Sequence, residues 1–249
     1  MIQFLAGTES SSCSSTRLVK SSDLAGIQIV NSLDDINGVH LWVYNEMLSL
    51  ADKENTKVLP VAVDFLKPIL KKRLLSSRIK SELLNKTLGK KHGYKTVLDA
   101  TAGMGVDSMI FASLGLDVIA FEKSAAIYLL LKDGLNRAFK DESLASISEK
   151  VNLQFADSLS FTGEVDVIYI DFMFSKADKK AKSKKNMEIF KKITSIPSDA
   201  GVTESFTQYL GFKFKRLVFK RPLKVEVLRI GNFSHSVVGK AIRYDIYLP

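Results

Sequence analysis

The sequence predicts an α/β fold: a seven-stranded mixed sheet with helices on both faces, preceded by a small N-terminal α+β subdomain. From residue 96 onward, short apolar runs alternate with helical patterns, which is typical of parallel strands joined by helices. A glycine-bearing turn, A-G-M-G-V-D, follows the first of these runs at 102–107. The 249 residues, of which 46% are hydrophobic, can bury a substantial core. We expect the subdomain to span 1–62 and the larger domain 63–249.

The first 91 residues carry weaker signals. We expect a strand at 1–6 and a flexible loop in the serine-rich tract that ends at Thr16, then short strands and one helix up to residue 62. Helical spacing returns at 64–91 and ends at Gly89, a residue typical of helix C-termini. Basic residues cluster around a break at 76–77, either as a solvated helix face or as a phosphate-contacting patch: Lys71, Lys72, Arg73, Arg78 and Lys80.

The segment at 96–122 predicts a nucleoside site. It reads as a strand at 96–99, a glycine turn, a helix at 107–114 and a second strand at 117–121 that closes on Glu122. Gly103 and Gly105 lack a Cβ atom, so the chain can turn sharply there and a ligand can approach the backbone closely. An acid at the end of the second strand can accept hydrogen bonds from the two hydroxyls of a ribose.

The same turn indicates which nucleoside fits. Asp107 lies in the first turn of the helix, where a carboxylate would repel a pyrophosphate and attract a cation. The turn also lacks the full G-x-G-x-x-G pattern of dinucleotide sites. Both features favour S-adenosylmethionine over a nicotinamide cofactor, although an unrelated α/β protein can also contain a glycine turn.

Two further strand ends bring polar and aromatic residues to the same edge of the sheet. After a helix at 124–140, the strand at 151–155 ends before Asp157 and Ser158, which we expect to contact the adenine, with a helix N-cap as the competing role. The strand at 165–170 leads into a run that could receive a flipped base, or that could simply be core: Asp171, Phe172, Met173 and Phe174.

The C-terminal third is rich in lysine. Residues 176–192 hold eight lysines, which predicts either a solvated segment or an electrostatic arm for an RNA backbone. A strand at 212–220 ends in Lys220 and Arg221, for which we expect phosphate contacts. Segments at 225–230 and 242–248 are expected to close the sheet as an antiparallel pair.

Composition restricts the partners and the location. The formal net charge of +9 and a pI near 9.4 indicate a polyanionic partner, either nucleic acid or an acidic membrane surface. No apolar run approaches the ~20 residues of a membrane span, and the N-terminus lacks a secretion signal, so we expect a soluble cytoplasmic protein. The single cysteine, Cys13, cannot form an internal disulfide, and the scattered histidines predict no metal site: His40, His92 and His235.

Several motifs occur in a specific order: DATAGMGVDSMIFASLG, FEKS, KDGLNRA, DVIYIDFMF, KKNMEIF, LVFKRP and RYDIY. With them the chain, from Val63 to its end, resembles the ribosomal RNA small subunit methyltransferase J family. The resemblance implies a Rossmann-like class I methyltransferase that uses S-adenosylmethionine to methylate the exocyclic N2 of a guanosine in small-subunit rRNA, as naked RNA or within a ribosomal particle. By position, the family's cofactor contacts fall on Val106, Asp107, Glu122, Lys123, Asp157, Ser158 and Asp171.

The chain also departs from the family pattern. Val106 and Lys123 stand where arginine is usual, Asp157 where a small residue is common, and L-S-S-R-I at 75–79 replaces G-G-G-R-G. The family's D-P-M-F-P becomes D-F-M-F-S at 171–175, and the missing proline removes a fixed φ from the substrate loop.

These observations predict roles for the residues that face the substrate. Asp171, or the backbone carbonyl beside it, would accept a hydrogen bond from the reacting amine, and Lys220 and Arg221 would hold phosphates. The aromatic run after Asp171 would stack on the base or form a wall beside it. A methyltransferase-like RNA-binding protein without catalysis and a methyltransferase for another amine remain alternatives, and a nicotinamide-dependent oxidoreductase fits least well.

Overall fold

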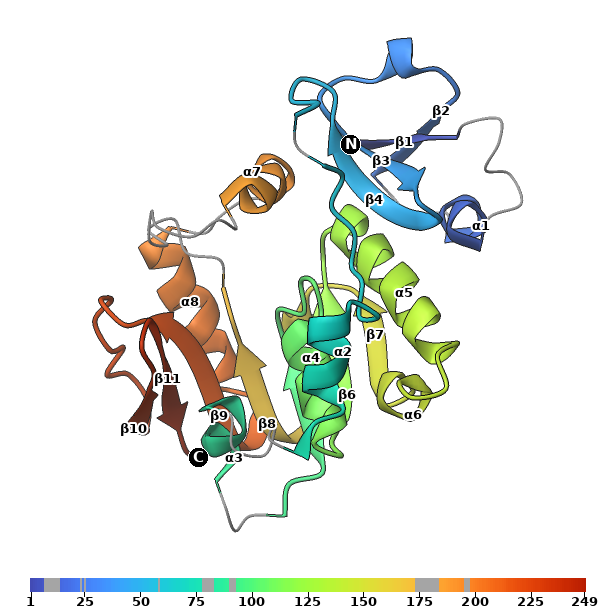
Figure 1. Ribbon diagram of the computed structural model, residues 1–249. Helices are drawn as coiled ribbons and strands as arrows, with labels where there is room; N and C mark the ends of the chain where they lie inside the picture. Colours follow the sequence, from blue (N-terminus) through green and yellow to red (C-terminus); the bar gives the residue numbers. More distant parts are fainter. Residues whose placement is uncertain are drawn as a thin grey trace.

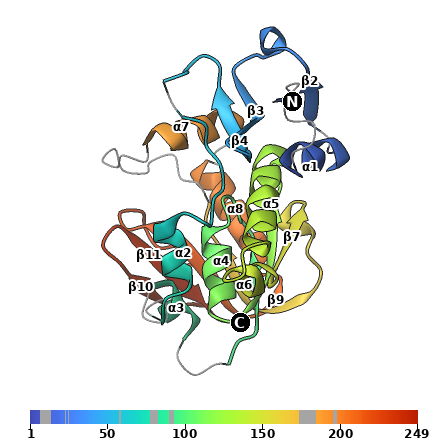
Figure 2. The ribbon, with the colours of Figure 1, turned by 45° about the vertical axis from the view of Figure 1, so that its right-hand side comes forward.

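The computed structural model describes residues 1–6, 14–22, 24, 26–57, 59–77, 83–89, 93–172, 184–194 and 198–249. Within these residues the strands form a seven-stranded sheet and a separate four-stranded sheet. Figures 1 and 2 show the smaller, N-terminal sheet above the end of α5 and the larger sheet with helices on both faces. Among the described residues, no helix is long and apolar enough to span a membrane.

The larger sheet confirms the predicted mixed α/β fold. Its order is β10-β11-β9-β8-β5-β6-β7, in which β9, β8, β5, β6 and β7 are parallel and β11 is antiparallel to both of its neighbours. The strands are β5 (Thr96–Asp99), β6 (Asp117–Glu122), β7 (Val151–Phe155), β8 (Glu164–Ile170), β9 (Lys213–Pro222), β10 (Phe233–Val238) and β11 (Ile242–Tyr247).

Successive residues of the central strands face different helices. Val97 of β5 and Val167 of β8 belong to the cluster that packs on α4 (Val106–Ser113) and α5 (Ala125–Phe139). Their neighbours Leu98 and Ile168 belong to the cluster that packs on α8 (Asp199–Tyr209). Since each strand is covered on both faces, a nearly continuous apolar run is the expected pattern.

The predicted strand at 225–230 is wrong, and β10 lies further along the chain. Side chains of β11 bind the carbonyl groups of the preceding segment: Arg243 donates to Leu223 O at 3.1 Å and to Val225 O, and Tyr247 Oη donates to Leu228 O at 2.6 Å. These bonds satisfy backbone acceptors without a strand ladder. The segment therefore lies against the sheet, and the chain pairs with β11 only from Phe233 onward.

The N-terminal sheet has the order β2-β1-β3-β4, with strands β1 (Ile2–Leu5), β2 (Ile27–Val30), β3 (Val39–Tyr44) and β4 (Met47–Asp52). A 3₁₀ turn, η1, follows β2 at Leu33–Asp35. The strand expected at 1–6 is confirmed. The loop expected through Thr16 is too long, because helix α1 already begins at Ser14 and continues to Ser22. Ser15 and Thr16 are buried there, so tertiary contacts outweigh the weak helix propensity of serine and threonine.

A buried carboxylate on α5 joins the two sheets. Asp133 accepts hydrogen bonds from Ser15 Oγ at 2.5 Å and from Leu48 N at 3.2 Å, both in the N-terminal part. It also accepts from Arg137 Nε at 3.0 Å, and Arg137 reaches Asp64 at 3.3 Å. The motif K-D-G-L-N-R-A therefore connects α5 to residues on either side of the predicted boundary.

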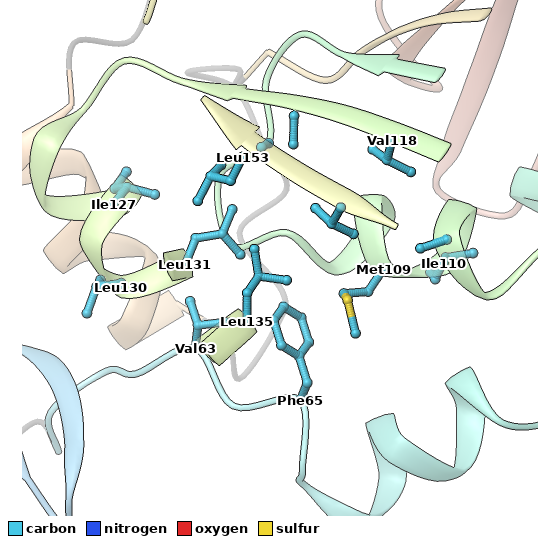
Figure 3. Packing of buried hydrophobic residues seen from close by; sticks show 14 of the residues in the cluster. Val63, Phe65, Met109, Ile110, Val118, Ile127, Leu130, Leu131, Leu135 and Leu153 are labelled. Atoms are coloured by element: carbon cyan, nitrogen blue, oxygen red, sulfur yellow. The ribbon is translucent and has the colours of Figure 1, made fainter. Parts of the chain in front are cut away.

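The chain that leaves β4 packs closely on α5. Val63 and Phe65 lie against Leu131 and Leu135 (Figure 3). A Cβ atom at Gly134 would lie 2.5 Å from Val63 Cγ1, so this contact requires glycine. Val63 and Phe65 are thus buried in the same hydrophobic cluster as α5.

Four more helices lie in the described part of the chain. They are α2 (Pro68–Leu74), α3 (Leu83–Leu88), α6 (Ala145–Ser148) and α7 (Lys184–Ile193). α3 ends as predicted at Gly89, whose φ is +79°. In the basic cluster, Lys71 pairs with Asp141 at 2.6 Å while Lys72 and Arg73 are exposed; Arg78 and Lys80 lie outside the described residues.

Candidate functional site

A cavity of about 730 Å³ opens where four parallel strands end. Its lining comes from the segments that follow β5, β6, β7 and β8, together with Lys220 of β9 and side chains of α7 and α8. This is the edge of an open α/β sheet at which ligands bind. All the cofactor-binding residues predicted from the sequence line it: Gly103, Gly105, Val106, Asp107, Glu122, Lys123, Asp157, Ser158 and Asp171.

The glycine turn has the expected left-handed backbone. Gly103 and Gly105 have φ values of +53° and +70°, and Gly105 is the N-cap of α4. A Cβ atom at Gly105 would lie 2.3 Å from Leu131 Cδ1 of α5. Packing against α5, in addition to the positive φ, therefore requires glycine at this position.

Glu122 lies at the end of β6, and each of its carboxylate oxygens accepts a hydrogen bond from a backbone N–H group. Oε2 accepts from Gly103 N at 3.1 Å, and Oε1 accepts from Ser124 N at 2.6 Å. Burial raises the pKa of Glu122, against the lowering effect of these two N–H groups. Because each carboxylate oxygen has two lone pairs, each can accept one more hydrogen bond. Two adjacent acceptors fit the two neighbouring hydroxyls of a ribose.

The residues after β7 have more than one role. Asp157 caps the 3₁₀ helix η3 (Ser158–Ser160) by accepting from Leu159 N at 3.1 Å, and it pairs with Lys123 at 3.3 Å. The N-cap that competed with adenine binding is thus confirmed for Asp157. The hydroxyl of Ser158 donates to Ala100 O at 2.8 Å and so must accept from Tyr209 Oη at 2.6 Å. It is buried and joins β5 to α8, so the predicted contact of this hydroxyl with adenine is not supported.

Three charged side chains meet on the cavity wall. Lys220 Nζ lies 2.9 Å from Asp107 Oδ2 and 2.8 Å from Asp171 Oδ2. Tyr169 Oη also donates to Asp107, and the backbone N–H of Asp171 donates to Thr101 Oγ1 at 2.7 Å. Burial opposes the charge on Lys220, but the two carboxylates outweigh it and raise the pKa of Lys220.

This arrangement corrects the phosphate contacts predicted for Lys220 and Arg221. The ammonium group of Lys220 is bound to carboxylates on the cavity wall. Arg221 is 5% exposed, and its guanidinium lies 4.9 Å above the ring of Phe219. Since successive strand residues point to opposite faces, the two side chains leave β9 on different sides. Arg221 does not line the cavity.

The aromatic run after Asp171 is only partly described. Phe172 lines the cavity and packs edge-to-face on Phe219, with ring centroids 5.8 Å apart. It is therefore both a core residue and part of the cavity wall. Met173 and Phe174 lie outside the described residues.

Several lining residues were not predicted from the sequence. Tyr169 precedes Asp171 by two residues in the chain, so strand periodicity could have placed it on the same side. Asp99 lies beneath the turn, where it accepts from Ser108 Oγ at 2.5 Å, and burial raises its pKa to about 7. No local pattern indicated the contribution of α7, of the residue that follows it, and of α8: Phe190, Ile193, Thr194, Ser205 and Tyr209.

The comparisons with known proteins agree with this geometry. A family model described as "Putative SAM-dependent methyltransferase" matches residues 25–249. Ribosomal RNA small subunit methyltransferase J of Bdellovibrio bacteriovorus is 37% identical over 84% of this chain and 81% of the relative. The Buchnera aphidicola protein of the same name is 34% identical over 84% and 87%. A crystal structure of a SAM-dependent methyltransferase from Neisseria gonorrhoeae superposes with a TM-score of 0.76 at 26% identity, covering 99% of this chain and 96% of the other.

Proposed function

This chain belongs to the ribosomal RNA small subunit methyltransferase J family of S-adenosylmethionine-dependent enzymes, and we propose that it methylates the exocyclic N2 of a guanosine in small-subunit ribosomal RNA. The observation that carries the proposal is the placement of Glu122 and Asp171 around one cavity, at the ends of β6 and β8, the two strands that flank β5. The names of the relatives supply the substrate class, and the family resemblance supplies the N2 position.

The cavity residues suit an adenosyl ligand. Glu122 would accept the ribose hydroxyls with the lone pairs that Gly103 and Ser124 leave available. Asp157 would accept from the adenine amine, and apolar side chains would cover the ring: Phe121, Ile127, Leu159 and Ile193. When bound, S-adenosylmethionine supplies a methyl group activated by a positively charged sulfonium.

Asp107 would contribute negative charge near that sulfonium. Val106, at the start of α4, would line the donor site beside it. Lys123 has a side chain that is 72% exposed, so we assign it to the rim, where it orients Asp157.

Asp171 is the residue that we assign to catalysis. The lone pair of a guanine amine is delocalised into the ring, so the enzyme must hold the amine in place and accept its hydrogen bond as positive charge develops. Asp171 would accept this bond and then the proton that the methylated amine loses. Phe172 would form a wall beside the base, with Met173 and Phe174 following it in the sequence.

The charge distribution supports an RNA substrate for the larger domain. Residues 63–249 contain 32 basic and 20 acidic residues, whereas residues 1–62 contain four basic and seven acidic residues. Nucleic-acid binding that depends on such an excess weakens steeply with salt. We therefore propose that the RNA contacts the domain that contains the cavity.

The direct test is transfer of a labelled methyl group. The protein is incubated with labelled S-adenosylmethionine and small-subunit RNA, naked or in particles, from cells that lack it. Mass spectrometry then locates the methylated base, and N2-methylguanosine is the expected product. Donor binding without methyl transfer to either RNA substrate would contradict the proposal. Methylation of another amine substrate, bound by the protein with an affinity that does not depend on salt, would contradict it as well.

The role of Asp171 has its own test. Asp171→Ala should lower the single-turnover rate by about 10²- to 10⁴-fold, the range for loss of a positioned acid–base group. Binding of donor and RNA should change much less. A variant that bound both normally and methylated at the wild-type rate would refute this role.

A further inference from the structure

Lys220 forms a bridge between two acids that come from different elements. Asp107 is in the first turn of α4, Asp171 follows β8, and Lys220 lies near the end of β9. The Lys220 side chain is 22% exposed, and those of Asp107 and Asp171 are 22% and 34% exposed. Partly buried ion pairs contribute little to stability relative to apolar contacts. Their position on the cavity wall therefore points to a functional role.

Without a cation, the two carboxylates would perturb each other. Carboxylates that share a site repel, and one of them takes up a proton at a pH where both would otherwise be ionised. The Tyr169 hydroxyl has one proton, which it already donates to Asp107. Burial raises the pKa of Asp171, and Lys220 is the cationic partner whose charge and hydrogen bond oppose that rise.

We propose that Lys220 is a positioning residue that keeps Asp171 ionised and holds its Oδ2 atom, so that Oδ1 is presented to the substrate amine. This inference rests on the proposed function. Methyl transfer forms the N–C bond and breaks the C–S bond, whose electron pair stays on sulfur. The proton released from nitrogen needs an ionised acceptor, which Lys220 maintains.

No other charged group in the described part of the chain replaces Lys220 beside Asp171. Among those residues, the other titratable groups that face this site are Asp107 of α4, Tyr169 of β8, Asp99 of β5 and Tyr244 of β11. Burial raises the pKa of Tyr169 well above its ordinary range and that of Tyr244 to about 12. The two tyrosines are therefore neutral near pH 7, and neither acid carries the positive charge that would favour the ionised form of Asp171.

The test compares three variants under single-turnover conditions with saturating donor and RNA. Lys220→Met removes the charge, Lys220→Arg keeps it, and Lys215→Met is the matched control. Lys215 lies on the same strand, is exposed, and pairs with Asp166 at 2.7 Å away from the cavity. Calorimetry gives the donor Kd, and circular dichroism checks folding.

The pH profile is the readout that a purely structural role would not change. An opposite charge within about 4–6 Å lowers a carboxyl pKa by about 1–3 units, so Lys220→Met should move the acid limb of the rate upward by about 1–3 pH units. At a pH below both acid limbs the variant should therefore be about 10- to 1000-fold slower than the wild type, and the two rates should converge in alkaline solution. Lys220→Arg should restore most of the rate, and Lys215→Met should match the wild type.

Other outcomes would overturn the inference. A loss of rate that is equal at every pH, a wild-type profile in Lys220→Met, or no rescue by Lys220→Arg would each refute it while the proposed function stands. If Lys220→Met does not fold, Lys220→Gln provides the same comparison. If the wild-type protein transfers no methyl group to RNA, the proposed function fails and this inference fails with it.

Discussion

Glu122→Gln tests the donor site with a nearly isosteric change. Both carboxylate oxygens accept backbone N–H groups, from Gly103 at 3.1 Å and from Ser124 at 2.6 Å. In glutamine, an NH₂ group replaces one oxygen and must face one of these donors. The backbone bond is lost in the free and the bound protein alike, so it largely cancels from the binding free energy. The hydrogen bond from one ribose hydroxyl exists only in the complex, so its loss does not cancel from the binding free energy.

The expected loss of donor affinity follows from that single lost hydrogen bond. A hydrogen bond to a charged group contributes about 1.5–3 kcal/mol, and 1.4 kcal/mol corresponds to a tenfold change in Kd. Donor affinity should therefore fall by about 10- to 100-fold. Titration calorimetry with S-adenosylmethionine at pH 8 measures it, because burial raises the pKa of Glu122 and a protonated carboxyl would resemble glutamine in acid.

The control is Glu142→Gln, which makes the same chemical change at an exposed site and should leave the Kd unchanged. A Glu122→Gln protein that is folded and binds the donor within about twofold of the wild type would refute the ribose assignment. Rising affinity as the pH falls below the ordinary range for glutamate would also refute it.

Three further predictions test the turn, the buried acid and helix α7. Gly105→Ala combines a left-handed φ, costing about 1–2 kcal/mol, with a Cβ placed 2.3 Å from the Leu131 side chain, costing about 1–3 kcal/mol. Scanning calorimetry should show a Tm lower than that of the wild type by about 5–15 °C, and an unchanged Tm would contradict the packing of the turn on α5. Because burial raises the pKa of Asp99 from 3.8 to about 7, the folded state binds a proton that the unfolded state has lost, so the free energy of unfolding falls as the pH rises from about 4 to 7. In urea unfolding, the stability of Asp99→Asn relative to wild type should therefore increase by about 2–3 kcal/mol between pH 5 and 8. A stability difference that does not change with pH would refute this prediction. Lys192 pairs with Asp52 at 2.7 Å and so holds α7 against β4. Titration calorimetry should show that Lys192→Ala weakens donor binding a few-fold, whereas Lys191→Ala, at the exposed neighbouring position, should not. Equal Kd values for the two variants would exclude this role of Lys192.

Strand ends were the most informative sequence signal. The runs at 96–99 and 151–155 match β5 and β7 to the residue, and the other parallel strands differ from the prediction by one or two residues at their ends. In a parallel sheet all carboxyl ends meet at one edge, so Glu122, Asp157 and Asp171 could be placed together without a tertiary structure. Of the antiparallel strands, the run at 242–248 matches β11 to within one residue, whereas the run at 225–230 missed β10, because an edge strand can satisfy its apolar pattern in several registers.

Periodicity and chain order are local properties, so they were enough to place the parallel sheet, the glycine turn and the acids at the strand ends. The partners of those acids depend on the folded chain. Lys220 pairs with Asp107, 113 residues away, and Arg221 is buried on the opposite side of β9. Lys192 of α7 reaches Asp52 across 140 residues. Such contacts depend on where distant elements pack, so no pattern within one segment predicts them.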